Sequence, residues 1–230
     1  MAGLGRRPRA AGLRGTGALV IIAIEGASTD LSVALRDADD FDVTASWSSA
    51  RRQSAELMPR LLELLAAHGR GLAETRAVAV GTGPGSFTGL RVAMAIAKGL
   101  AMALDRPIVG VPSLTAWLAS SPEADAAIAR AGARDAYLLA RGEDSVRIID
   151  GGELPALLDG RTVIAPGELV EAFAIERAVS PSRAAAAVAR MTAERLESRA
   201  EGDDLRRLEP IYLRAPRGTL AEPAGEVRWL

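Results

Sequence analysis

The feature that most constrains the fold is a short apolar stretch that leads directly into a glycine-rich loop and a long alanine-rich segment. Ala77 to Val80 has the continuous apolar character of a buried strand, and the loop Gly81 to Gly89 follows it without a spacer. Apolar residues then recur at helical spacing to about Leu104. A strand, a tight loop and a helix in this order indicate an α/β fold.

The segments on either side of this unit predict the rest of a mixed sheet. Leu19 to Glu25 is a β-branched apolar run, typical of a strand that is buried on both faces. Two alternating segments, LSVALRD from Leu31 and FDVTASW from Phe41, predict a β-meander after it. A helical pattern from Gln53 to His68 and a short strand from Ile108 to Val111 complete the expected first lobe.

The pattern becomes weaker beyond Ser120, which indicates a smaller second lobe. Ala136 to Ala140 and Val146 to Ile149 predict a hairpin, and Arg183 to Ser198 predicts a helix. Thr162 to Ala165 predicts one further strand. We therefore expect a disordered basic extension at residues 1–18, a first lobe at 19–111, a reduced second lobe at 112–214 and a tail at 215–230.

Composition narrows the function classes. The chain has 28 basic and 29 acidic residues among 230, so its net charge of −1 does not favour direct capture of nucleic acid. There is no cysteine, and the single histidine, His68, sits at a helix end beside Gly69, where we expect it to cap or face solvent. We therefore expect no metal site. Since no apolar run reaches the roughly 20 residues of a membrane span, we expect a soluble, cytoplasmic protein.

The glycine-rich loop has two interpretations. Gly83, Gly85, Ser86 and Thr88 lie where a helix begins, and amides at such a position favour a phosphate group. The loop lacks the lysine and hydroxyl ending of a P-loop. The second interpretation is a capped turn, in which the Ser86 side chain accepts a hydrogen bond from the helix start and Phe87 packs on the core.

The helix after the loop carries a ridge of small side chains. Gly89, Ala93, Ala97 and Ala101 recur every fourth residue, so another backbone can approach this side of the helix closely. The ridge either packs inside the chain, on the helix from Gln53, or forms a subunit interface. The residues assigned to such an interface are Leu57, Leu61, Leu64, Leu65, Gly89, Leu90, Ala93, Met94, Ala97 and Ala101.

The run GTGPGSFTGLRVAMAIAKGLA, residues 81–101, resembles the most diagnostic segment of the TsaB (YeaZ) family, GxGPGSFTGLRxGxxxAxGLA. IIAIEGASTDLSVALRD is similar to the opening of that family, ILAIDTSTxxxSVAL, and IVGVPSLTAW is similar to its IxGVSSLxAL segment. PIYLR, residues 210–214, resembles its closing YLR. The resemblance spans residues 19–214 and is weakest in the middle of the second lobe.

The resemblance implies an actin-like ATPase fold of two RNase H-like lobes with mixed sheets, the second lobe reduced. It also implies a non-catalytic subunit that forms a heterodimer with TsaD, the enzyme that makes N6-threonylcarbamoyladenosine beside the anticodon of ANN-decoding tRNAs. The ATPase TsaE binds that pair, tRNA is reached only through the complex, and no membrane is involved. The family also implies no catalytic residue, no metal and no tightly bound cofactor here.

Two alternatives stay open beside this interpretation. The first is a small ATPase or acyl-transfer enzyme that would use Glu25 as an acid or as a ligand of a metal-bound water, and the loop from Gly83 to Thr88 as a cradle for the phosphates of ATP. The chain departs from the family here, because Glu25-Gly26-Ala27-Ser28 replaces Asp-Thr-Ser-Thr and two hydroxyls are lost. The second alternative is a homodimer formed through the same helical face when the chain is alone.

Overall fold

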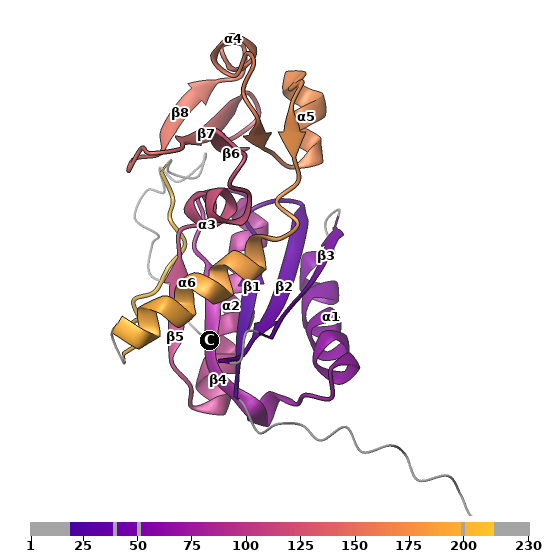
Figure 1. Ribbon diagram of the computed structural model, residues 1–230, viewed down its shortest axis with the longest axis vertical. Coiled ribbons are helices and arrows are strands. Elements are labelled where there is room, and N and C mark those ends of the chain that lie inside the picture. The colour runs from indigo at the N-terminus through magenta and orange to yellow at the C-terminus, as the bar shows by residue number, and fades with distance from the viewer. Residues whose placement is uncertain (1–18, 39–40, 50–51, 199–200, 214–230) are drawn as a thin grey trace, which may run out of the picture.

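The computed structural model describes residues 19–38, 41–49, 52–198 and 201–213. The expected basic extension, residues 1–18, and the expected tail, residues 215–230, lie outside this part of the chain. The described residues form two mixed five-stranded sheets, which are arranged along the longest axis of the molecule (Figure 1). The predicted α/β class with two lobes is confirmed.

The first sheet is built around the apolar run at the start of the described chain. Its strands are β1 (Val20–Glu25), β2 (Asp30–Arg36), β3 (Asp42–Ser48), β4 (Thr75–Gly81) and β5 (Ile108–Val111), in the order β3-β2-β1-β4-β5. β1 is antiparallel to β2 and parallel to β4. All six residues of β1 are buried, as expected for a central strand with both faces covered.

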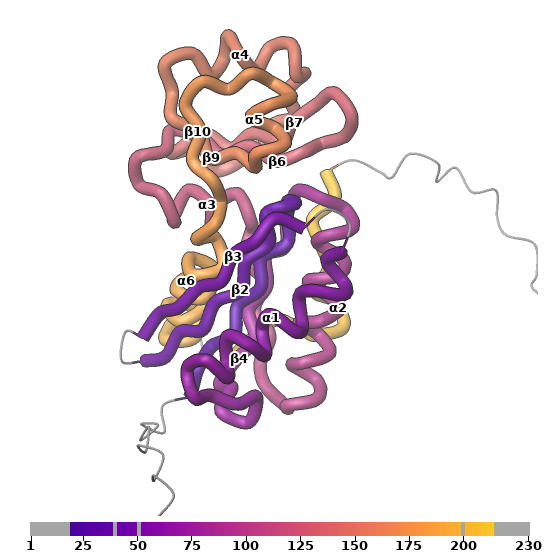
Figure 2. Tube along the Cα trace, turned by 90° about the vertical axis from the view of Figure 1, so that its right-hand side faces the viewer, coloured from indigo at the N-terminus to yellow at the C-terminus, as the bar shows by residue number. Residues whose placement is uncertain are grey.

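Helices cover both faces of this sheet. α1 (Gln53–Ala67) and α2 (Phe87–Leu104) lie together on one face, and α6 (Ala184–Ser198) lies on the other (Figure 2). The alternation of side chains along β1 explains the division, because Ile22 and Ile24 join the α1 and α2 core while Ile21 and Ala23 join the α6 core. A 3-10 turn at Leu72–Glu74 precedes β4.

The small ridge of α2 belongs to this core, which corrects the interface expected from the sequence. Ala93 and Ala97 are fully buried, and they pack in one cluster with Ile22 and Leu57. Of the ten residues assigned to a docking face, only Leu64 is partly exposed. Those that are buried are Leu57, Leu61, Leu65, Gly89, Leu90, Ala93, Met94, Ala97 and Ala101. The ridge is internal because small side chains let α2 approach the sheet and the turn after β1.

Gly26 and Gly89 show how close that approach is. A Cβ atom on Gly89 would lie 2.2 Å from the Gly26 carbonyl oxygen, and one on Gly26 would lie 2.8 Å from the Gly89 carbonyl oxygen. Within the described part of the chain, α2 is also the one helix that is long and apolar enough for a membrane span. Its ridge lies against the sheet instead, as in the core helix of a globular domain.

The second sheet has the order β10-β9-β6-β7-β8. The predicted hairpin is confirmed as β7 (Asp135–Ala140) and β8 (Arg147–Asp150), and the predicted strand near residue 163 as β9 (Val163–Ile164). The sequence pattern missed β6 (Ala126–Arg130) and β10 (Ala178–Val179). Two short helices, α4 (Leu154–Leu157) and α5 (Gly167–Phe173), cover the outer face of this sheet.

Helix α3 (Ser113–Ser120) joins the two lobes. Leu114 and Trp117 pack against Ala127 and Leu139 of the second sheet, in a cluster that also contains Leu90 of α2. α6 packs on α3 as well as on β1 and β2. The expected division into residues 19–111 and 112–214 therefore differs from the structure, because α6 and the residues after it complete the first lobe.

Residues 201–213, here called the C-terminal strap, run along the outer edge of β5. Asp203 forms an antiparallel β-bridge with Ile108. Its carboxylate accepts a hydrogen bond from the Gly110 amide at 2.8 Å and forms an ion pair with Arg195. Ile211 then donates its amide to the Thr82 carbonyl at 2.7 Å. The strap thus protects an edge strand that would otherwise present unpaired backbone groups.

Candidate functional site

The polar residue at the end of the central strand is enclosed by the first lobe. Glu25 is only 1% exposed. Its Oε1 atom accepts a hydrogen bond from the Ala27 amide at 2.7 Å. The Ser113 hydroxyl lies 2.9 Å from Oε2 and 3.1 Å from Oε1, so it donates its one proton to this carboxyl. Glu25 therefore holds the turn after β1 and the start of α3 together.

Two further residues shape the space around this carboxyl. A Cβ atom on Gly81 would lie 1.8 Å from Glu25 Oε2. The Glu25 side chain therefore fits beside β4 only because the last residue of that strand is glycine. The buried indole N–H of Trp117 has no hydrogen-bond partner among the described residues. The Trp117 side chain is itself fully buried.

Burial dominates the ionisation of Glu25. Desolvation raises the pKa of its carboxyl from 4.5 to about 7, against the lowering effects of the Ala27 amide and the Ser113 hydroxyl. No charged side chain in the described part of the chain contributes to this shift. The carboxyl is chemically suited to exchange a proton near neutral pH, but the surrounding residues leave no room for a substrate beside it.

The glycine-rich loop uses its amides within the protein. Gly83 donates its amide to the Ser113 hydroxyl at 2.9 Å, and Ser86 donates its amide to the Ala27 carbonyl at 2.7 Å. The Ser86 hydroxyl accepts from the Gly89 amide at 3.3 Å, which is the predicted helix cap. A Cβ atom on Gly85 would lie 2.2 Å from the Ala27 carbonyl oxygen. The geometry thus agrees with the capped-turn interpretation of the loop.

Of the four residues in the possible phosphate loop, Thr88 alone has an exposed side chain. Gly83 is buried, and Gly85 and Ser86 are partly buried against the turn after β1. Phe87 is 44% exposed and packs on Tyr212 of the strap, with ring centroids 5.4 Å apart. The expected packing of Phe87 into the core is therefore wrong, because its ring faces the strap at the surface.

The outward side of α2 carries apolar side chains, as its buried side does. Ala95, Gly99 and Met102 are exposed, and Val92 is partly exposed, and these four positions follow one another at helical spacing. Arg91 and Lys98 flank this row on one side of the helix. We call Val92, Ala95, Gly99 and Met102 the outer row of α2. An apolar row on the outward side of a helix whose opposite side is already buried is typical of a helix that is covered from both sides.

Further hollows lie elsewhere on the described surface. A groove of about 710 Å3 between the lobes is lined by apolar side chains that include Pro84, Leu118 and Ile211, with Glu143 and Asp144 in the turn that closes it. Arg141 also lines the groove, but its guanidinium donates to the Ala124, Leu118 and Ser121 carbonyls. A groove with these charges does not favour a phosphate-bearing ligand.

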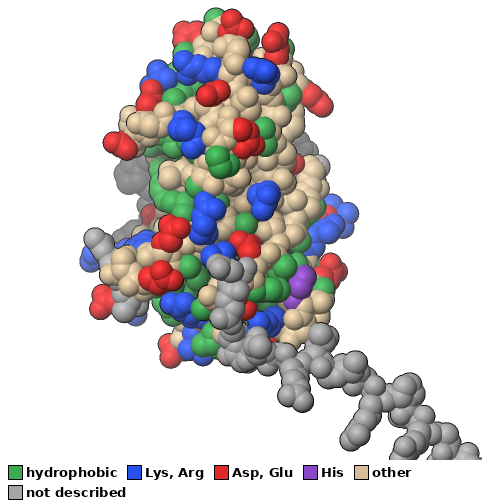
Figure 3. All heavy atoms as spheres, in the orientation of Figure 1, with side chains coloured by type: hydrophobic (Ala, Val, Ile, Leu, Met, Phe, Trp, Pro, Cys, Tyr) green, Lys and Arg blue, Asp and Glu red, His purple; other side chains and the backbone are tan. Residues whose placement is uncertain are grey.

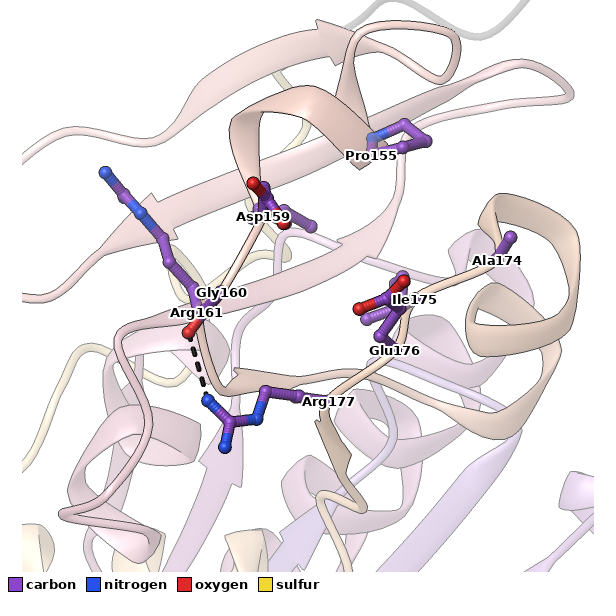
Figure 4. Close-up of a pocket in the computed structure, with 9 residues that line it drawn as sticks. Pro155, Asp159, Gly160, Arg161, Ala174, Ile175, Glu176 and Arg177 are labelled. Carbon is purple, nitrogen blue, oxygen red and sulfur yellow. Dashed lines mark hydrogen bonds between the residues drawn. The ribbon is translucent and has the colours of Figure 1, made fainter.

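A smaller hollow is a cavity of about 70 Å3 in the second lobe, between the ends of α4 and α5 (Figure 4). Arg161, Arg177, Asp159 and Glu176 line it, so its charges are mixed, and Arg177 donates to the Gly160 carbonyl at 3.3 Å. Among the described residues, no cluster of three His, Asp or Glu side chains is placed to hold a metal ion. The face in Figure 3 carries acidic and basic side chains interspersed.

Sequence reasoning identified Glu25 but missed its two α3 neighbours. Ser113 lies 88 positions away in the sequence, and neither its type nor its neighbours mark it as a carboxyl partner. A signal for this contact is the predicted strand β5, which ends just before Ser113. Because β1, β4 and β5 are parallel, their carboxyl ends meet at one edge of the sheet, and Glu25 and Ser113 both lie there. In the sequence, Trp117 stands out only as the last residue of the segment IVGVPSLTAW.

Comparisons with known proteins agree with this geometry. Residues 47–196, more than half of the chain, match the protein family described as "TsaD: tRNA N6-adenosine threonylcarbamoyltransferase". The chain is 38% identical over 95 residues to the tRNA threonylcarbamoyladenosine biosynthesis protein TsaB of Escherichia coli, covering 41% of this chain and 40% of that protein. For TsaB of Haemophilus influenzae the identity is 37% over 98 residues, covering 43% and 41%. The matched stretch thus spans about two fifths of each curated relative.

A solved structure extends the likeness over the whole fold. YeaZ from Pseudomonas aeruginosa superposes with a TM-score of 0.65 at 25% sequence identity, covering 85% of this chain and 100% of that one. Two mixed sheets joined by α3, with an acidic residue at the end of the first strand, define the class of two-lobed proteins with an actin-like ATPase, RNase H-like fold. The chain belongs to the TsaD family, which its residues 47–196 match. Its similarity to TsaB and YeaZ proteins places it in the TsaB (YeaZ) branch of that family.

Proposed function

We propose that this chain is a non-catalytic, activating subunit in the formation of N6-threonylcarbamoyladenosine beside the anticodon of ANN-decoding tRNAs. Its TsaB relatives are named as biosynthesis proteins for this modification, and the family that it matches is named for the transferase. The enclosed carboxyl of Glu25 and the internally bonded loop support a role without catalysis. tRNA is reached through the complex.

The partner in this proposal is TsaD, and the outer row of α2 is the docking surface. This is the observation that carries the proposal, since Val92, Ala95, Gly99 and Met102 leave an apolar helix face uncovered in the isolated chain. Small side chains on such a face permit close approach of a partner helix. The surface replaces the buried ridge that the sequence suggested. TsaE, an ATPase, would bind the assembled pair.

We propose that the chain holds no nucleotide of its own and works in the cytoplasm with its partner. The amides of Gly83, Ser86 and Gly89, which a phosphate would need, already have acceptors within the protein. The alternative of a small ATPase or acyl-transfer enzyme has no observation in its favour, because Glu25 has no open space beside it.

The decisive experiment is reconstitution of tRNA threonylcarbamoylation from threonine, bicarbonate and ATP with matched TsaD, TsaE and the remaining pathway proteins. Product should require this chain, and the chain alone should neither hydrolyse ATP nor form product. Equal product without the chain would refute the activating role, and ATP hydrolysis by the isolated chain would refute the non-catalytic one.

The docking surface is tested by changing the outer row without touching the core. Ala95→Glu and Met102→Glu should weaken TsaD binding at least tenfold in sedimentation or calorimetry while the chain remains folded. Ala156→Glu is the matched control, because Ala156 is exposed on α4 in the second lobe. Unchanged binding by both outer-row variants would exclude this surface. Concentration-dependent sedimentation without TsaD separates a homodimer through the same row.

A further inference from the structure

The two edges of the first sheet differ in how the chain covers them. Among the described residues, the strap covers the β5 edge through the bridge between Asp203 and Ile108, whereas no backbone hydrogen bond reaches the outer side of β3 (Figure 2). β3 pairs with β2 over all seven of its residues without a bulge, and Val43 to Ser48 contains no proline and no charged side chain. Natural proteins normally interrupt or cover an edge of this length. β3 therefore has the features of a strand that pairs with another chain.

The hydrogen bonds between β2 and β3 show which backbone groups of β3 face outwards. Ser49 donates its amide to the Thr29 carbonyl at 2.8 Å at one end of the ladder, and Asp37 donates to the Phe41 carbonyl at 3.1 Å at the other. Because bonded and non-bonded pairs alternate in an antiparallel ladder, the odd-numbered residues of β3 are the ones that bond to β2. The N–H and C=O groups that point to the open side belong to Asp42, Thr44, Ser46 and Ser48.

We propose that β3 pairs with β3 of a second copy of this chain, antiparallel to it, about a two-fold axis at Ala45. The two first sheets then form one continuous sheet, and the pairing covers the whole of Asp42–Ser48. Thr44 lies opposite Ser46 of the second copy, so the outward groups of one strand meet those of the other. This surface is separate from the docking surface for TsaD, because α2 packs over β4, β1 and β5 and its outer row stays free.

The side chains of β3 are complementary to themselves in this register. Ala45 lies opposite Ala45 at a non-bonded pair, where Cα atoms approach to about 4.5 Å and a small side chain fits. Val43 lies opposite Trp47, a β-branched and aromatic pair of the kind that stabilises antiparallel strands. Both side chains pack against the core under α1, so the apolar layer continues across the axis. Asp42 lies opposite Ser48, so no like charges meet.

The Trp47 ring is held in place before any pairing. Its indole N–H donates to Glu56 at 3.1 Å, and the Arg60 guanidinium lies 4.9 Å from the ring centroid. Glu56 and Arg60 both belong to α1, so this helix fixes the ring beside the open edge. A side chain that is already fixed loses little conformational freedom when a partner binds, which favours association.

A cross-linking experiment tests the register, because the chain has no cysteine and one introduced thiol reports on one position. Ala45→Cys should form a disulfide-linked dimer under mild oxidation, since Cα atoms about 4.5 Å apart suit a disulfide. Ser48→Cys is the matched control. Ser48 is more exposed than Ala45 but lies opposite Asp42, so this variant should cross-link far more slowly. Failure of Ala45→Cys to cross-link, or equal rates for the two variants, would overturn the proposal.

Hydrogen exchange tests the pairing without any substitution. As the concentration of the unmodified chain rises, exchange of the Thr44 and Ser46 amides should slow, because these amides are bonded only in the dimer. Exchange of the Val43 and Ala45 amides should stay constant, because they bond to β2 at every concentration. A concentration dependence shared by all four amides, or absent from all four, would contradict pairing at this edge.

Ser46→Pro removes an outward amide and no bond to β2, and edge strands tolerate proline at such positions. The variant should stay folded by circular dichroism and still bind TsaD. Its dimer should be weaker by about tenfold or more in sedimentation, because the two-fold axis makes the lost bond count twice. Ala95→Glu on the outer row of α2 is the control and should leave the dimer intact.

Two results in sedimentation overturn the proposal: a chain that stays monomeric at every concentration, and a dimer that is lost in Ala95→Glu but kept in Ser46→Pro. If Ser46→Pro does not fold, Thr44→Pro takes its place, and the exchange of the unmodified chain decides. Loss of TsaD binding in Ala95→Glu alone concerns the proposed docking surface and leaves the pairing of β3 unaffected.

Discussion

The Ser113 hydroxyl lies 2.9 Å from Oε2 of Glu25, although the two residues are 88 positions apart in the sequence. The contact joins the end of the central strand to the start of the helix between the lobes. It also fills the space beside Gly81, where a Cβ atom would lie 2.8 Å from the same hydroxyl oxygen. The packing at this junction leaves no room for an added methyl group.

Gly81→Ala should therefore destabilise the fold. The new methyl would overlap Glu25 Oε2, and overpacking of a buried site typically costs about 1–3 kcal/mol. Chemical denaturation followed by circular dichroism measures the change. Gly99→Ala is the control, because nothing lies within 4 Å of its added Cβ atom and the helix should gain about 0.5–1 kcal/mol. Equal stability of both variants would contradict the crowding at Gly81.

Stability should fall as pH rises through the neutral range. Burial raises the pKa of Glu25 in the folded protein to about 7, against an ordinary value of 4.5, so the folded protein binds one extra proton between these values. The contribution is fully present below pH 4.5 and is lost as pH rises through 7. Its size is at most roughly 3 kcal/mol by linkage.

Denaturation midpoints of the unmodified chain and Glu25→Gln at pH 5, 6, 7 and 8 measure this dependence. The difference between the two proteins isolates Glu25 from the other carboxyls. The glutamine variant should lose the decline between pH 5 and 7. A stability difference that is constant across this range would show that Glu25 ionises normally in the folded chain.

The C-terminal strap should depend on Asp203. Burial raises the pKa of this carboxyl, but the Arg195 guanidinium and the Gly110 amide lower it further, so it lies below its usual value. Asp203→Ala should cost about 1–2 kcal/mol, because Arg195 and Gly110 lose a charged acceptor. Hydrogen exchange at Gly110 should also become faster.

Arg207→Ala is the matched comparison for the strap. Its ion pair with Asp204 joins side chains that are 89% and 55% exposed, so its loss should change stability by less than about 0.5 kcal/mol. If Asp203→Ala and Arg207→Ala have the same small effect, and exchange at Gly110 is unchanged, the strap is not held by Asp203.

The two sides of α2 should respond differently to the same substitution. Ala97 is fully buried in the core, so Ala97→Glu places an unpaired charge there and should unfold the chain. Ala95 is exposed two positions earlier, so Ala95→Glu should leave the circular dichroism spectrum unchanged. A folded Ala97→Glu variant that fails to bind TsaD would restore the interface that the sequence first suggested.

Most of the first lobe could be predicted because its local patterns agree with its tertiary environment. The buried run of β1 and the alternating meander each have one consistent interpretation, and the structure confirms them to within a few residues. β6 was missed because Ala126–Arg130 is mostly alanine, which gives little strand signal until Tyr137 and Leu139 pair opposite it.

The burial of nine of the ten predicted interface residues could not be read from the sequence for a different physical reason. Helical spacing shows that small residues share one side of α2, but it cannot say whether that side faces the sheet or solvent. The opposite side is also apolar at Val92, Ala95 and Met102, so amphipathic contrast was absent. The contact between Glu25 and Ser113 depends on strand order, which local patterns do not contain.

The return of α6 and the strap to the first sheet has a consequence for synthesis on the ribosome. Residues 126–179, the strands of the second sheet with α4 and α5, are an insertion within a lobe that begins at β1 and closes with α6. The face of β1 and β2 that α6 covers stays exposed until residues 184–198 have left the exit tunnel. The inserted lobe can therefore complete its own sheet first. The first lobe, which begins at β1, is completed only when α6 has been synthesised.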